Sequence, residues 1–146
     1  MKKATIKLRR GAYHYGLTGS FQVIAGQLAL MDGVDRLMLP RRRGHFFWIP
    51  PRGVLHAHAD THLSPVDTTP ELLADLLMEV HGLRCLHAYG DSEGLIRAVV
   101  DMMTVDGQLE INNLFLAEVT GMARESVAKH LNQRPSKHLF RSRAHA

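Results

Sequence analysis

The spacing of apolar residues changes near Pro65, and this change limits what the chain can fold into more than any other feature. Before Pro65, apolar residues alternate with polar ones in short runs separated by Gly and Pro, which is typical of β-strands. After Pro65 they recur every three or four positions, which is typical of amphipathic helices. For a chain of 146 residues, this order predicts an α+β protein, either one domain or two small units that share a core.

The strand-like half begins with residues 20–33, where Gly26 separates two alternating runs and Asp32-Gly33 is a hairpin turn signal. Three more short runs follow, and prolines at 40 and 50–51 are predicted to end the first two of them. Short strands with closely spaced turn signals predict an antiparallel meander, and therefore a small β-barrel or sandwich. The three runs cover residues 34–40, 45–51 and 53–59.

The turn Pro50–Gly53 is expected to connect two of these strands tightly. Trp48 and Ile49 precede it, and we expect them to lie on opposite faces of the sheet with one of them buried. If Gly53 has a positive φ, a side chain at this position strains the backbone.

Two amphipathic helices are predicted after residue 65. The first has Thr69 in a capping position and Pro70 at its first helical position. Its apolar stripe is more typical of an intramolecular core than of a partner surface, and a partner surface remains the alternative. The apolar faces contain Leu72, Leu73, Leu76, Leu77 and Val80 in the first helix and Leu95, Ile96, Val99, Val100 and Met103 in the second.

The segment NNLFLAEVTGMARESVAKHLNQ, residues 112–133, has the spacing of a DNA-binding helix-turn-helix. Asn112 or Asn113 can cap the first helix. Ala117 is the small residue at which the second helix crosses the first, and Gly121 is suited to a left-handed turn. The shared core is predicted to contain Leu114, Val119, Met122, Val127 and Leu131.

The outer face of the second helix carries side chains that can read DNA. Arg pairs with guanine, Glu accepts a hydrogen bond from cytosine, and Ser or Lys reaches phosphates or bases. A solvated amphipathic helix is the alternative interpretation. The predicted DNA-binding residues are Arg124, Glu125, Ser126, Lys129, His130, Arg134 and Lys137.

Charge is distributed unevenly, although the net charge is only +4. The balance is +8 over residues 1–54, −9 over residues 55–120 and +5 over residues 121–146. A basic segment next to a compact helix attracts phosphate backbones by releasing counterions. Basic tails also occur without any ligand, so this pattern supports the helix-turn-helix interpretation without deciding it.

The strand-like half resembles a known family. The segment LPRRRGHFFWIPPRGVLHAH, with YHYGLTGSFQVIAGQLALMDG before it, is similar to the ligand-binding cupin barrel of AraC/XylS-type transcription regulators. The resemblance implies an antiparallel cupin-like barrel followed by helices, with His56 pointing toward the barrel mouth. It also implies a ligand site that contains His14, Trp48 and His56.

The helical half carries two further resemblances. The segment RESVAKHL resembles the recognition helix of CRP/FNR-type regulators, which marks Arg124, Glu125 and Lys129 as DNA contacts. The following NQRPSKHLFRSRAHA resembles the AraC-type continuation. Both families place a β-barrel sensor before the DNA-binding part. We favour AraC/XylS because of the barrel, although its members usually carry two helix-turn-helix units and one is visible here.

Histidines raise the alternative of a metal-binding cupin. His14, His56 and His58 can supply imidazoles, and His56 and His58 are two apart on a strand, so they share a face. The cupin metal motif also requires a carboxylate after its His-x-His, and no Asp or Glu fits that position. We therefore predict no metal site and no cofactor.

The sequence as a whole predicts a DNA-binding transcription regulator that is not an enzyme and acts on double-stranded DNA as a homodimer with a small-molecule effector. The expected regions are a barrel over 1–65, a connecting helix over 66–90 and a DNA-binding region over 91–146. A single cysteine, no apolar run long enough for a bilayer and no signal-like N-terminus predict a cytoplasmic protein without membrane contact. The alternatives are a small metal-binding cupin protein or enzyme, and a non-DNA-binding inhibitor of a longer regulator.

Overall fold

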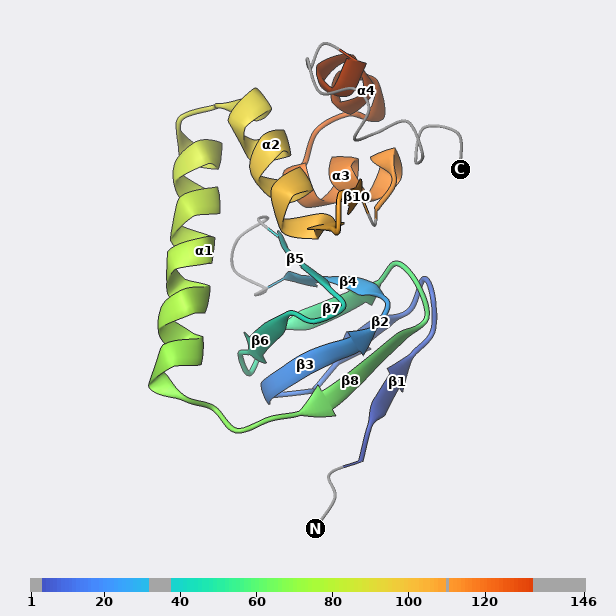
Figure 1. Cartoon of the computed structure of the whole chain (residues 1–146), viewed down its shortest axis with the longest axis vertical. Helices are drawn as coiled ribbons and strands as arrows, with labels where there is room; N and C mark the ends of the chain where they lie inside the picture. Colours follow the sequence, from blue (N-terminus) through green and yellow to red (C-terminus); the bar gives the residue numbers. More distant parts are fainter. Residues whose placement is uncertain (1–3, 32–37, 110, 133–146) are drawn as a thin grey trace.

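The computed structural model describes residues 4–31, 38–109 and 111–132, which form a β-barrel-like unit and a helical region (Figure 1). The predicted α+β class is confirmed. The barrel strands within these ranges are β1 (Ile6–Leu8), β2 (Tyr13–Tyr15), β3 (Gly19–Ala25), β4 (Gln27–Met31), β5 (Met38–Arg42), β6 (Phe46–Ile49), β7 (Val54–Ala57) and β8 (Thr61–Pro65). The other elements are α1 (Pro70–Ala88), α2 (Ser92–Met103), β9 (Thr104–Val105), β10 (Gln108–Leu109), α3 (Asn113–Thr120) and α4 (Arg124–Asn132).

The strands form two antiparallel sheets, ordered β1-β8-β3-β6 and β2-β7-β4-β5. The predicted meander is therefore wrong, because β3 pairs with β6 and β8 rather than with β4. The chain leaves β3 and enters β4 of the other sheet at Gly26, which has a φ of 91°. A Cβ atom there would lie 2.7 Å from Cα of Thr61, so this corner requires glycine.

Pro40 does not end a strand as predicted. It lies inside β5, where it is paired with Ala29 of β4. Strand β5 is at the edge of its sheet, and an edge strand tolerates a proline because one side of it needs no ladder hydrogen bond.

The residues that point between the two sheets form the barrel core. On β6, Ile49 is fully buried whereas Trp48 is 38% exposed on the other face, as predicted. Gly53 does not have a positive φ. Its constraint is instead a close approach, because a Cβ atom there would lie 2.8 Å from Cγ2 of Ile49. The other barrel residues in the core are Leu8, Phe21, Val23, Leu28, Leu30, Leu39, Phe47, Leu55, Ala57 and Leu63, whereas buried Ala29 lies on the outer face of its sheet opposite His56.

Helix α1 runs alongside the barrel (Figure 1). Thr69 caps it by accepting a hydrogen bond from Leu72 N at 3.1 Å, and Pro70 is its first residue, as predicted. Buried Arg41 of β5 ties the barrel to this helix through an ion pair with Glu79. None of the described helices is long and apolar enough to cross a membrane.

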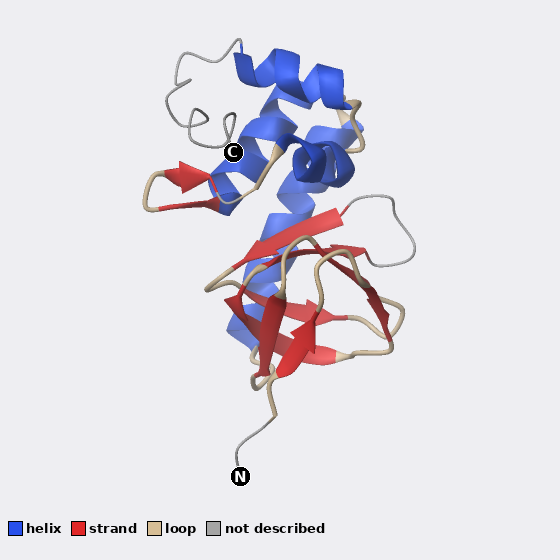
Figure 2. Ribbon diagram, turned by 90° about the vertical axis from the view of Figure 1, so that its right-hand side faces the viewer, coloured by secondary structure: helices blue, strands red, loops and turns tan. Residues whose placement is uncertain are grey.

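Helices α2, α3 and α4 gather at one end of the barrel, next to β5 (Figures 1 and 2). Asp91 caps α2 by accepting a hydrogen bond from Gly94 N at 2.9 Å. All five apolar residues predicted to form one face of this helix are buried. The short hairpin β9–β10 then leads the chain into α3.

Candidate nucleic-acid interface

Helices α3 and α4 form the predicted helix-turn-helix. Asn112 caps α3, accepting a hydrogen bond from Phe115 N at 2.9 Å. Gly121 follows the last residue of α3 in the left-handed conformation, with φ 72° and ψ 15°. A left-handed residue at this position ends a helix and turns the chain, and glycine adopts it without steric strain. The turn was therefore correctly predicted from the sequence.

The inner face of α4 packs against α3 and α2. Val127 and Leu131 of α4 are buried, as are Ala117 and Val119 of α3. Leu114 is the exception among the predicted core residues, because it is 53% exposed. It lies near the start of α3, where the neighbours Phe115 and Leu116 take the buried positions instead.

The outer face of α4 presents charged side chains to solvent. Arg124, Glu125 and Lys129 are exposed, whereas Ser126 and His130 are partly buried. With 100° per residue, Lys129 lies opposite the midpoint between Val127 and Leu131. Within the described part of the chain, no residue forms an ion pair with Arg124, Glu125 or Lys129. Arg134 and Lys137 lie outside the described residues.

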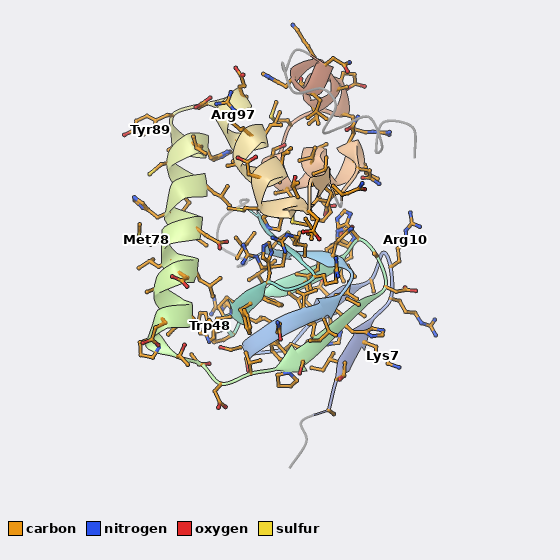
Figure 3. All side chains as sticks on the ribbon, viewed as in Figure 1. Lys7, Arg10, Trp48, Met78, Tyr89 and Arg97 are labelled. Carbon is orange, nitrogen blue, oxygen red and sulfur yellow. The ribbon has the colours of Figure 1, made fainter. Side chains whose placement is uncertain are left out.

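The three residues predicted to bind a ligand do not come together. His14 is opposite Leu55 in the β2–β7 pair, so it is on the core side of that sheet. Trp48 lies between β6 and α1 (Figure 3). His56 is on the outer face of β7 and contacts α3, so it does not point toward the barrel mouth.

Trp48 lines an apolar groove of about 450 Å³ between the barrel and α1. The groove has Arg84 as its one charged lining residue among those described. Its apolar lining consists of Leu30, Leu39, Trp48, Pro50, Leu73, Leu76, Leu77, Val80 and Leu83. A cavity of this size and composition suits a small apolar ligand.

A cluster that the sequence analysis missed connects the barrel to the helix-turn-helix. Glu118 of α3 places Oε1 2.6 Å from Nδ1 of His56 and Oε2 2.6 Å from Nε2 of His58. Burial is the main cause that lowers the pKa of His58, and the Glu118 carboxylate opposes this effect. Glu118 is 62 residues from His56 in the sequence. The signal in the sequence that could have identified this residue is that Glu118 is a single acid on a short apolar helix, between Ala117 and Val119, which are both buried.

Comparisons with known proteins point to one fold. No protein-family model matches the chain, and no curated protein matches it. Among solved structures, a CooA mutant from Carboxydothermus hydrogenoformans is 18% identical, with a TM-score of 0.59 over 89% of this chain and 75% of that one. A Crp/Fnr-family regulator from Eubacterium rectale is 18% identical, with a TM-score of 0.60 over 88% and 76%. A CRP-family transcriptional regulator from Thermus thermophilus is 17% identical, with a TM-score of 0.55 over 87% and 82%.

The chain has a CRP/FNR-like fold, with a β-barrel-like unit before a helical region. The comparisons thus agree with the resemblance of the α4 sequence to CRP/FNR-type recognition helices. They do not support the AraC/XylS resemblance that we favoured, nor a cupin assignment for the barrel. The AraC/XylS resemblance rested on a short barrel motif, a proline-bounded strand followed by histidines. This motif is compatible with many small barrels, so it does not identify one family.

Proposed function

We propose that this protein is a DNA-binding transcription regulator in which α4 enters the major groove. The observation that carries the proposal is the position of α4. It follows a left-handed glycine turn, buries Val127 and Leu131 against the preceding helices, and leaves Arg124 and Lys129 exposed. In a helix-turn-helix, the N-terminal residues of the second helix contact base edges. The likeness in fold to CRP/FNR-family regulators supports the same function, and a non-enzymatic one.

In this proposal Arg124 and Glu125, at the N-terminal end of α4, read base edges. Lys129 and His130, one turn later, lie near the wall of the groove with Ser126. Arg134 and Lys137 would add phosphate contacts from the segment after α4. The roles of residues 1–65 as a sensing or dimerising barrel, 66–90 as a connecting helix and 91–146 as the DNA-binding region belong to the same proposal, as does a cytoplasmic location.

A second copy of the chain is the partner that the geometry favours. One helix-turn-helix covers too little DNA for tight specific binding, and such motifs act as dimers on half-sites one helical turn apart. Helix α1 exposes Met78, which points away from the barrel (Figure 3), and its neighbour Leu77, which also lines the groove beside Trp48. A symmetric pairing of two α1 helices would bury both side chains on each copy. A small apolar effector in the groove beside Trp48 would contact the same helix, and so would be coupled to dimer geometry.

Selected-site sequencing, followed by binding measurements at two salt concentrations, tests the proposal. Arg124→Ala should cost roughly 1–3 kcal/mol on the selected site and relax the preference at one base pair. Lys129→Ala should weaken all sequences about equally and reduce the salt slope by about one unit. Arg97→Ala is the matched control, because Arg97 is an exposed cation on α2, paired with Glu93.

Specific binding that survives the combined replacement of Arg124, Glu125 and Lys129 by Ala would overturn the recognition-helix role of α4. Absence of any sequence selection by the wild-type chain would overturn the function itself.

A further inference from the structure

The contacts between β7 and α3 combine three side chains that are ordinary metal ligands. His56, His58 and Glu118 each offer one ligand atom, and these atoms all lie within 4.8 Å of one another. Two imidazoles with one carboxylate form a donor set that Zn²⁺ and Fe²⁺ accept, with the remaining positions left to water or a ligand. The three residues are partly buried, so bulk water does not dominate the site.

The contact between His58 and Glu118 is short and lies out of solvent. Nε2 of His58 is buried and has no hydrogen-bond partner among the described residues. Oε2 of Glu118 lies 2.6 Å away, within ion-pair distance of this nitrogen. A buried imidazole nitrogen beside a carboxylate is a pair of donor atoms that a metal ion can bridge once they separate to ligand distance.

Aromatic side chains hold the two imidazole rings in place. Tyr13 stacks on His56 with ring centroids 4.1 Å apart and an interplanar angle of 3°. Phe115 packs edge-on against His58 with centroids 4.2 Å apart.

Ligand atoms around a tetrahedral Zn²⁺ are about 3.4 Å apart, given bond lengths near 2.1 Å. Each of the two 2.6 Å contacts between Glu118 and an imidazole would therefore lengthen by about 0.8 Å on binding an ion.

We propose that His56, His58 and Glu118 bind one divalent first-row transition metal ion, Zn²⁺ by its donor preference, which links the barrel to the first helix of the helix-turn-helix. The two histidines supply imidazole nitrogens from β7 and the loop after it, and Glu118 supplies carboxylate oxygen from α3. Because α3 carries α4, the ion fixes the candidate recognition helix relative to the barrel. The site exists only in the folded chain, so metal binding stabilises the fold.

The test is a titration of the full chain, freed of metal by chelation, with Co²⁺ as a spectroscopic probe for Zn²⁺. The wild-type chain should bind one equivalent with visible d–d absorption, which Zn²⁺ displaces. Glu118→Gln and His58→Gln should each weaken binding by at least about 100-fold, more than the loss of an outer-shell partner does. His62→Gln, on β8 of the other sheet, should leave the affinity unchanged.

Two measurements guard against a variant that does not fold. Far-UV circular dichroism checks each variant before titration. In the wild-type chain itself, one equivalent of Co²⁺ should broaden the ring signals of His56 and His58 before those of the other histidines. Zn²⁺ should also raise the thermal midpoint of the wild type and the His62 variant but not of the Glu118 variant.

Equal Co²⁺ affinity in the wild type and in Glu118→Gln would overturn the proposal, as would first broadening at other histidines. Absence of Co²⁺ binding by the folded wild-type chain would show that the cluster is an ion pair only. None of these readouts involves DNA, so this site and the proposed function can fail independently.

Discussion

Helices α1 and α2 follow one another in the chain but use their apolar residues differently. Helix α1 has 19 residues and buries only Leu83 fully. Helix α2 has 12 residues and buries five. Leu77 of α1 is 69% exposed, and the space between this helix and the barrel holds the groove beside Trp48. The difference indicates that α2 belongs to the core of the monomer, whereas α1 retains a face suited to a second copy and a groove suited to an effector.

The largest expected effect separates the two helices by stability. Ile96→Ala in α2 should lower the free energy of unfolding by about 2–5 kcal/mol, because it opens a cavity in a packed region. Leu77→Ala in α1, made as the matched variant, should change it by about 0.5 kcal/mol or less at protein concentrations where the chain is monomeric. Urea unfolding of both variants measures the contrast. Similar losses would mean that α1 is a core helix after all.

The next effect concerns assembly. Replacing Leu77 and Met78 together by Glu should weaken dimerisation by about 100-fold, or about 2.8 kcal/mol, because four carboxylates would face one another across a two-fold axis. Analytical ultracentrifugation measures the dimer dissociation constant. Ile24→Glu, on β3, is the control for an exposed apolar residue on the barrel. If it dissociates the dimer and the α1 variant does not, the barrel is the interface.

A smaller effect is expected at the turn that joins β6, which faces α1, to β7, which faces α3. Gly53→Val should cost about 1–3 kcal/mol, because the new side chain would overlap Ile49 and Pro50. A control glycine must lie outside the helices, because a variant such as Gly82→Val would also change the helix propensity of α1. Gly11→Ala tests positive φ alone, since a Cβ atom at Gly11 meets nothing within 4 Å. An unchanged midpoint in Gly53→Val would show that the turn yields without strain.

The smallest expected effect is a dependence of folding stability on pH, caused by His45 on the α1 side of the barrel. Burial, together with Arg41 and Arg42, lowers the pKa of His45 from 6.5 to about 3. The unfolded chain therefore takes up a proton below pH 6.5 that the folded chain does not, and stability falls as the pH decreases toward 3. The maximal slope is about 1.4 kcal/mol per pH unit, and partial exposure reduces the loss by pH 5 to about 1 kcal/mol.

Urea unfolding between pH 8 and pH 5 measures this dependence. His45→Gln should flatten it, because the amide does not titrate. A variant with the wild-type slope would assign the pH dependence to other groups. His87 is exposed near the end of α1. If its replacement flattens the pH dependence as much as His45→Gln does, the dependence does not belong to His45 alone.

The elements that were predicted correctly depend on interactions a few residues apart. Thr69 caps α1 through the amide of Leu72, and Gly121 turns the chain directly after α3. The 3.6-residue period likewise identified all five buried positions of α2. In each case the residue types, at short separation, favour one local backbone conformation, whatever the rest of the chain does.

The elements that were predicted wrongly depend on which distant segments meet. The pairing of β3 with β6 and β8, and the place of Pro40 on an edge strand, follow from how two sheets close over one core. The same closure separates His14, Trp48 and His56.

The sequence by itself therefore determined the order of the classes of structure, the helix boundaries near their caps, and the inner and outer faces of α4. Only the tertiary structure decided that Glu118 meets His56 and His58, and that most of α1 remains uncovered. The physical reason is the distance along the chain over which each kind of interaction acts. Capping and periodicity act within about one helical turn, whereas contacts between distant segments are chosen by the collective burial of apolar surface, which no short motif encodes.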